Sequence, residues 1–147
     1  MRGDIEMNVL KSIEKELIKE LKYFSVDNSD ITNAERLALD IAKNYSACTL
    51  CEILLDISVQ YTFYSDIQIG ICKILEHFEL EEVKPYGLSV ISYLLILKDE
   101  TVKEYVISVV ENWSAVEFLP ALKRLKCSSP WLKEYNNNVI KYLEEVI

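Results

Sequence analysis

The sequence contains few of the residues on which β-rich folds depend. Glycine and proline each occur three times in 147 residues, whereas a fold of many short strands needs turn residues at regular intervals. Half of the residues are hydrophobic, which is too large a share for a disordered chain. A chain of this length can bury a sizeable core as one domain. These features favour a single all-α domain over residues 1–147.

Long apolar runs are also missing. The longest uncharged one, Pro85–Leu97, is too short to cross a bilayer. The N-terminal stretch carries charges throughout, unlike a secretory signal. Four cysteines without such a signal suggest reduced thiols and a cytoplasmic location. Met7 offers an alternative start, which leaves open whether residues 1–6 are native.

Positive charge is scarce relative to negative charge. The 16 basic and 24 acidic residues give a formal net charge of −8. Nucleic acids and anionic membranes repel a chain with this balance. The electrostatic expectation is therefore a basic protein partner.

The clearest pattern lies in Asp99–Cys127, which we expect to form two short helices joined by a tight turn. Asp99 can cap the first helix, whose apolar residues have the spacing of one buried face: Val102, Val106, Val109, Val110 and Trp113. Ser114 and Glu117 have capping-box spacing at the start of the second helix. Pro120 falls in the first turns of that helix, where its missing N–H costs least.

A degenerate copy of this stretch lies upstream. A shift of 35 residues (120 minus 85) places Pro120 on Pro85 and Trp113 on Phe78. A further shift of 33 (67 minus 34) matches the next apolar positions more weakly. Recurrence at this period is typical of an α-solenoid. Amphipathic helices can align by periodicity alone, but periodicity does not account for the matching prolines.

The whole chain is predicted to form about eight helices. Three helix pairs over about 32–62, 65–97 and 100–127 are flanked by capping helices at 4–24 and 130–146, with turns expected at 25–30 and 80–84. Thr32 and Glu35 have capping-box spacing, and Tyr45 is expected on the buried side of the helix at 33–45. Residues 46–64 are ambiguous, because part of this segment alternates as a strand does. We expect a helix from about Thr49, with Thr49 and Glu52 as a capping pair, because a lone strand would have no partner.

The helix pairs, the early proline in the second helix and the closing segment PWLKEYNNNVIKYLEE resemble HEAT-type repeats. The similarity covers about residues 66–145 and rests on apolar pattern more than on fixed residues. The resemblance implies a curved stack of helices with an extended binding surface. It implies nothing about a reaction.

No group of side chains indicates catalysis. Cys48 and Cys51 have CxxC spacing, but a zinc site needs further ligands, and His77 is the single histidine. A redox CxxC usually follows a strand, which we do not expect here. We interpret the cysteines as small apolar residues at a helix start and His77 as a satisfied polar residue. Carboxylates are too common in this chain to single out a catalytic pair. We expect no enzyme activity, no metal and no cofactor.

The remaining hypothesis is a protein-interaction module. Its size, acidity and helical character resemble the small immunity proteins paired with contact-dependent growth inhibition toxins, many of which are nucleases with basic active clefts. An acidic surface would steer association with such a cleft and occlude it. The residues that we expect at the contact combine acids with tyrosines, which are frequent at binding hot spots: Glu52, Asp56, Tyr86, Ser89, Tyr93 and Glu117.

Two other functions stay open. The chain could be a HEAT-like scaffold or adaptor subunit in a larger assembly. It could instead be a HEAT-like enzyme of the lyase or DNA glycosylase kind, although the latter requires a basic groove and the net charge is −8.

Overall fold

A computed structural model of the chain describes residues 2–23 and 31–147, and every regular element in these ranges is helical. The all-α prediction is therefore confirmed for this part of the chain. The elements, in chain order, are α1 (Arg2–Lys22), α2 (Asn33–Asn44), α3 (Ala47–Gln60), α4 (Ser65–Leu75), α5 (Leu80–Val83), α6 (Tyr86–Leu95), α7 (Glu100–Trp113), the 3-10 helix η1 (Val116–Phe118), α8 (Leu119–Arg124) and α9 (Pro130–Val146).

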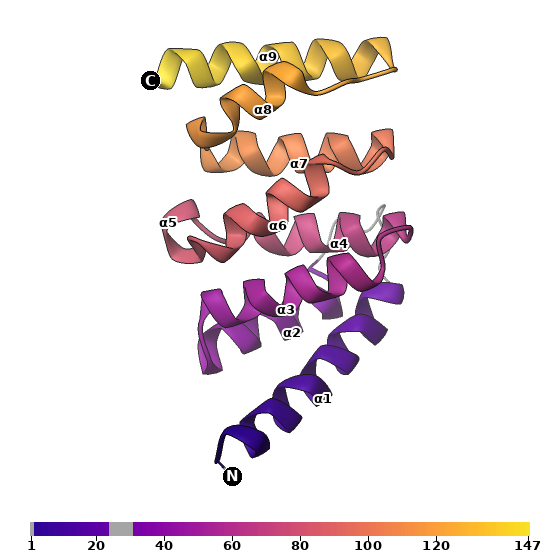
Figure 1. Cartoon of the computed structure of the whole chain (residues 1–147), viewed down its shortest axis with the longest axis vertical. Helices are drawn as coiled ribbons and strands as arrows, with labels where there is room; N and C mark the ends of the chain where they lie inside the picture. Colours follow the sequence, from indigo (N-terminus) through magenta and orange to yellow (C-terminus); the bar gives the residue numbers. More distant parts are fainter. Residues whose placement is uncertain (1, 24–30) are drawn as a thin grey trace.

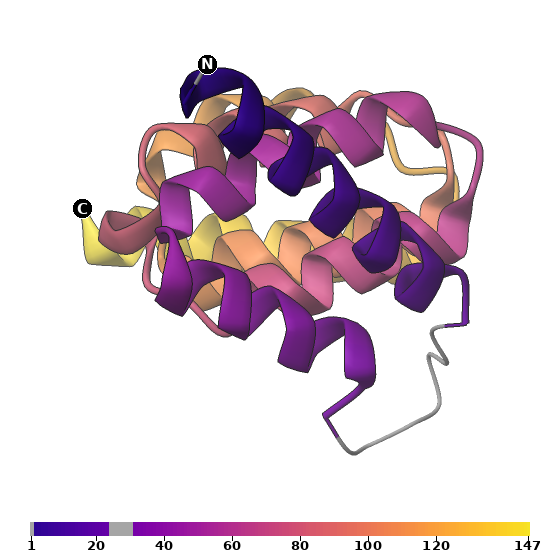
Figure 2. The ribbon, with the colours of Figure 1, turned by 90° about the horizontal axis from the view of Figure 1, so that it is seen from below.

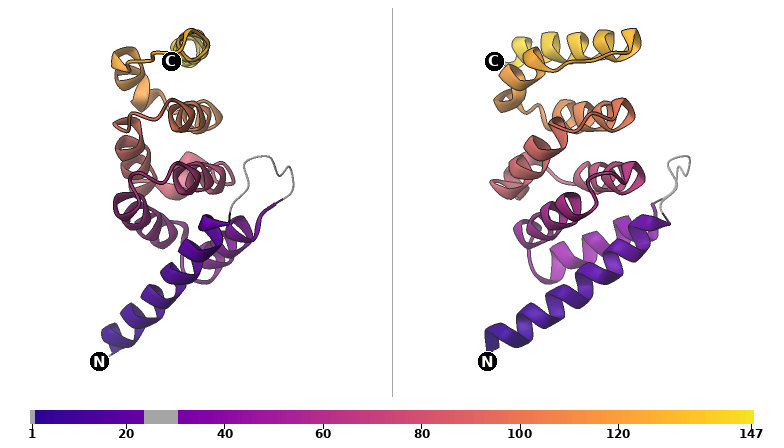
Figure 3. Two further views of the ribbon diagram at one scale, coloured as in Figure 1. Left: turned by 90° about the vertical axis from the view of Figure 1, so that its right-hand side faces the viewer. Right: turned by 45° about the vertical axis from the view of Figure 1, so that its right-hand side comes forward.

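The helices are stacked along the long axis of the molecule, with α1 at one end and α9 at the other (Figure 1). In the left view of Figure 3 they form two layers, with α3, α6 and α8 in one and α4, α7 and α9 in the other. α2 continues the second layer, because it packs against α4, which packs against α7, which packs against α9. α1 crosses the end of the stack diagonally (Figure 2), in contact with α2, α3 and α4.

α7 lies in the centre of this arrangement, between α4, α6 and α9. The apolar positions predicted for it are all buried: Val102, Val106, Val109, Val110 and Trp113. The apolar positions 35 residues earlier, in α4 and just after it, are buried too: Ile67, Ile71, Ile74, Leu75 and Phe78. The two segments meet directly, because Trp113 Nε1 donates to the backbone oxygen of Phe78 over 2.9 Å.

Two predicted helix starts have the expected caps. The backbone N–H of Glu35 donates to Thr32 Oγ1, and the Glu35 carboxylate accepts from the Thr32 backbone N–H, which forms a capping box. Asp99 Oδ1 accepts from the backbone N–H of Val102 over 3.0 Å. At each start, a side chain therefore satisfies one of the backbone N–H groups that lack a partner within the helix, as the sequence predicts.

The capping box predicted at Ser114 and Glu117 is wrong. Ser114 has φ 49° and ends α7 in the left-handed conformation, and its hydroxyl hydrogen-bonds with that of Tyr142 over 2.6 Å. The chain continues through η1 into α8, which has Pro120 in its first turn as expected. A left-handed residue that closes one helix cannot also cap the next one with extended backbone.

Other predicted boundaries differ by a few residues. Ser46, not Thr49, caps α3, and its hydroxyl accepts from the Thr49 backbone N–H. Ser65 is the first residue of α4 and donates its hydroxyl to Asp99 Oδ2 over 2.6 Å. The segment predicted as a turn at 80–84 contains α5, which raises the number of α-helices from the eight predicted to nine within the described ranges. Phe24 and the turn predicted at 25–30 lie outside the described residues.

A close approach of helices explains the glycine at position 87. A Cβ added there would lie 2.5 Å from Val83 Cγ2 and 2.8 Å from Val83 Cβ. Val83 has no exposed surface, so α5 or α6 would have to move.

We expect Gly87→Ala to lower the free energy of unfolding by roughly 1–3 kcal/mol, although alanine favours helix by about 1 kcal/mol. Urea denaturation measures the change.

Ser89→Ala is the matched control, because Ser89 is on the same helix and its side chain is exposed. It should leave the stability unchanged or slightly raised. Equal stability of the two variants would show that α5 and α6 do not pack this closely.

Candidate functional site

Acidic side chains gather on the outward side of α3 and on the elements beside it. We call this region the acidic surface and define it by Glu14 of α1, Glu52 and Asp56 of α3, Tyr86 of α6, and Glu117 of η1. Glu52 and Asp56 are one helical turn apart on the same side of α3, and both are exposed. Four of these five residues carry a carboxyl group, so the surface is negatively charged.

Glu52 connects α3 to α6. Its carboxylate accepts a hydrogen bond from the Tyr86 hydroxyl, and this bond, with the charge of Glu52, raises the pKa of Tyr86. The side chain of Tyr86 is 38% exposed. The pair therefore presents an aromatic ring next to a carboxylate on the open surface of the molecule.

Asp56 lies next to Glu14 of α1. Burial and a hydrogen bond with the Asp56 side chain raise the pKa of Glu14 from 4.5 to about 7, and the charge of Asp56 adds to the rise. Two carboxyl groups that hydrogen-bond to each other favour the state with one shared proton. Asp56 also accepts a hydrogen bond from Gln60 Nε2 over 2.8 Å. The acidic surface thus contains a carboxyl pair that changes charge near neutral pH.

Glu117 is joined to the rest of the surface through Lys84. Lys84 Nζ lies 2.9 Å from Glu117 Oε2 and 3.0 Å from Glu81 Oε1. The hydrogen bond from Lys84 lowers the pKa of Glu117. The backbone oxygen of Lys84 accepts from Cys48 Sγ of α3 over 3.3 Å. Glu117 therefore belongs to the surface, but Lys84 offsets part of its charge.

Ser89 and Tyr93 follow Tyr86 along the same side of α6. Ser89 is exposed, whereas Tyr93 is half-buried and its hydroxyl hydrogen-bonds with Thr62 Oγ1 at the end of α3. The structure thus brings Glu52 and Tyr86 into contact, places Ser89 and Tyr93 on the same helix, and joins Glu117 through one lysine. Whether these six residues bind a partner stays a prediction.

The cysteines and the histidine have structural contacts. Cys51 is buried, and burial raises the pKa of its thiol to about 12, so it stays protonated and unreactive at neutral pH. His77 Nε2 lies 3.0 Å from Glu35 Oε1, which links α4 to α2. Within the described residues, no group of three or more histidine, cysteine, aspartate or glutamate side chains could hold a metal ion.

Sequence reasoning missed Glu14. Its partner Asp56 is 42 residues away (56 minus 14) on another helix. The spacing of Glu14 along α1 resembles that of the neighbouring charged residues, so no local signal distinguishes it. The pKa of Glu14 is raised because α1 packs across α3, which buries Glu14 and brings it next to Asp56.

Comparisons with protein-family models, curated proteins and solved structures give no match for this chain. None of the helices in the described ranges is both long and apolar enough to cross a membrane. The geometry and charge of the acidic surface are therefore the basis for the function proposed below.

The raised pKa of Glu14 predicts a stability that depends on pH. Between pH 4.5 and about 7 the folded chain holds a proton on Glu14 that the unfolded chain has lost. The stabilisation is therefore complete below pH 4.5 and is lost as the pH rises through 7. Glu14→Gln cannot ionise, so it should raise the free energy of unfolding at pH 8 by about 1 kcal/mol after allowance for solvent screening. It should change the stability little at pH 4.5.

Glu16→Gln controls for the loss of one negative charge, because Glu16 is exposed on the same helix. Its effect in urea denaturation should be small and similar at both pH values. A gain for Glu14→Gln that is no larger at pH 8 than at pH 4.5 would contradict the raised pKa of Glu14.

Proposed function

We propose that this chain is a protein-interaction module that binds a basic protein partner through the acidic surface. The observation that carries the proposal is the set of carboxylates on and beside α3: Glu52 and Asp56 on the helix itself, Glu14 next to Asp56, and Glu117 joined to α3 through Lys84. The Glu52–Tyr86 pair adds an aromatic group with little conformational entropy to lose. Negative charge concentrated on one side steers a positively charged partner toward that side.

We further propose that the stack is an α-solenoid of HEAT-like helix pairs. Three observations support this assignment: the two-layer arrangement (Figure 3), the burial of equivalent apolar positions in α4 and α7, and the placement of Pro85 and Pro120 at the start of the second helix of a pair. α1 and α9 would then cap the two ends, since each covers one end of the stack. Such units bury their apolar faces only against neighbouring units.

The partner that fits best is a toxin domain whose active cleft binds a nucleic acid. A nuclease cleft must be basic to bind the phosphate backbone. A rigid acidic surface competes for that cleft and excludes the substrate. This proposal makes the chain an immunity protein of the kind paired with contact-dependent growth inhibition toxins, acting in the cytoplasm without an enzymatic activity of its own.

The alternative is a scaffold subunit in a larger assembly. The exposed side of α6, with Ser89 and Tyr86, would serve such a role equally well. The two functions differ in what the partner does, because only an immunity protein abolishes the partner's activity on binding.

The test uses the toxin-like domain encoded next to this chain, where there is one, and the paired variant Glu52→Lys with Asp56→Lys. We expect its affinity for that domain to fall by roughly a hundredfold or more, because two attractive charges become repulsive at the contact. Calorimetric titration measures the affinity, and survival of cells that express the toxin measures protection. Unfolding does not explain such a loss, since removing the Asp56 carboxylate also removes the repulsion on Glu14.

The matched control is Glu134→Lys with Glu145→Lys, which makes the same charge change on exposed positions of α9. Its affinity should stay close to that of the unchanged chain apart from a small long-range effect. Unchanged binding by the Glu52 and Asp56 variant would show that the partner does not bind the acidic surface. Tight binding without protection would favour the scaffold function.

A further inference from the structure

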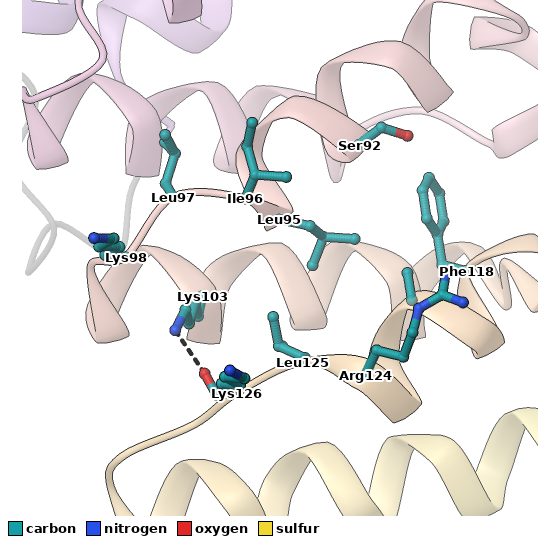
Figure 4. Close-up of a pocket in the computed structure, with 11 residues that line it drawn as sticks. Ser92, Leu95, Ile96, Leu97, Lys98, Lys103, Phe118, Arg124, Leu125 and Lys126 are labelled. Carbon is teal, nitrogen blue, oxygen red and sulfur yellow. Dashed lines mark hydrogen bonds between the residues drawn. The ribbon is translucent and has the colours of Figure 1, made fainter.

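A pocket of about 420 Å³ lies between the connection from α6 to α7 and the helix α8 (Figure 4). Its floor is apolar and comes from the end of α6, from η1 and from α8: Leu95, Ile96, Leu97, Phe118, Ala121 and Leu125. Its charged lining residues are all basic: Lys98, Lys103, Arg124 and Lys126. We call this pocket the cationic groove. The cationic groove and the acidic surface share no residue. Both use α6 and η1, but the groove uses the end of α6 and Phe118, whereas the acidic surface uses Tyr86 at the start of α6 and Glu117.

Three of the four cations are available to a ligand. The side chains of Lys98, Arg124 and Lys126 are exposed and form no ion pair within the described part of the chain. Lys103 is different, because its Nζ lies 3.1 Å from Glu100 Oε2 and donates to the backbone oxygen of Lys126 over 2.6 Å. Figure 4 shows this bond joining the two walls. Lys103 therefore holds the groove together, and the other three cations face solvent.

The absence of acids from this lining stands out against the composition. The chain has 24 acidic and 16 basic residues, yet the pocket lining contains four basic residues and no acidic one. Lys98 follows the end of α6, and Arg124 lies in the last turn of α8, where cations offset the partial negative charge of a helix terminus. The helix-terminus effect accounts for Lys98 and Arg124 one at a time. It does not explain why the ends of α6 and α8 face the same apolar floor.

The charges lie on both sides of the apolar floor. In Figure 4, Lys98, Lys103 and Lys126 are together at one side, Arg124 lies beside Phe118 at the other, and Leu95 and Leu125 are between them. A ligand with one anionic head and an apolar tail would use only one of these sides. A ligand with anionic groups on either side of apolar groups would use both.

The apolar surface continues past Lys98. A second pocket, of about 380 Å³, shares Ile96, Leu97 and Lys98 with the cationic groove and extends to Phe63 in the α3–α4 connection. Its lining includes one acid, Asp99, whose carboxylate accepts hydrogen bonds from the Ser65 hydroxyl and the Val102 backbone N–H. Phe63 is 96% exposed and Ile96 is 73% exposed. Apolar side chains this exposed and this close together are typical of a surface that binds something. The two adjoining pockets suit a ligand longer than one small molecule.

We propose that the cationic groove and its extension to Phe63 bind a peptide segment in which acidic residues flank apolar ones. The carboxylates pair with Lys98, Lys126 and Arg124, and the apolar side chains cover Ile96, Leu97 and Leu125. The segment belongs to a partner protein. This binding is independent of the acidic surface, and it stands whether or not that surface binds a basic protein.

The test measures the binding of short fluorescein-labelled peptides to the full chain by fluorescence anisotropy. One set has glutamates on either side of leucine and phenylalanine, a second has lysines in place of the glutamates, and a third has serines in place of the apolar residues. We expect only the first set to bind, with an affinity that falls as salt is added, because exposed charges are screened.

Two variants of the chain then locate the site. Replacing Lys98, Arg124 and Lys126 together by glutamine should weaken binding of the first set by roughly tenfold, since each exposed ion pair contributes modestly. The matched control replaces Arg36, Lys133 and Lys141 by glutamine, which removes the same charge from exposed positions on other helices. Ile96→Ser should also weaken binding, and it does not threaten the fold because Ile96 is largely exposed.

Several outcomes would overturn the proposal. Failure of every glutamate–leucine peptide to bind would do so, as would equal weakening by the control triple variant. Equal binding of the serine set would show that the apolar floor is not used. Binding to phosphatidylserine vesicles in place of the peptides would assign the surface to a membrane instead.

Discussion

The burial of α7 between α4, α6 and α9 is the constraint on which the rest of the structure depends. A helix with apolar residues on more than one side is stable only when neighbours cover each side. The Trp113 side chain of α7 donates a hydrogen bond to the backbone oxygen of Phe78, just after α4, and this bond holds α7 in position against the end of α4. Gly87 permits α6 to approach α5 and Trp113 closely. The layers, and the surfaces that they leave exposed, follow from this central burial.

The layers also separate charge. The outward side of α3 carries Glu52 and Asp56, with Glu14 brought beside them by α1. The connections at the ends of α6 and α8 carry Lys98, Arg124 and Lys126 around an apolar floor. A net charge of −8 describes neither region. The electrostatic field near each surface depends on the nearby charges, because salt screens those farther away than about 10 Å. The molecule can therefore present surfaces of opposite sign to different parts of its surroundings.

Local signals in the sequence predicted the apolar sides of α4 and α7 and the caps at Thr32 and Asp99, because each depends on residues three or four positions apart. The same spacing rule failed at Ser114 and at Thr49. At Ser114 the chain takes a left-handed conformation to close α7. At Thr49 a competing serine three residues earlier caps the helix. Spacing shows which residues could cap a helix, but the path of the chain decides which one does.

Tyr45, predicted to be buried, is 46% exposed, because it lies just past the end of α2.

The sequence by itself determined the helical class and the burial of the apolar side of α7, since these follow from composition and from periodicity within single helices. Only the tertiary structure decided which surface residues meet. Glu14 gains a raised pKa because α1 crosses α3, and Lys84 bridges Glu81 and Glu117 because η1 packs near α5. The cationic groove exists because the ends of two helices face each other across an apolar floor. Contacts between residues far apart in the chain depend on helix packing, which no local pattern specifies.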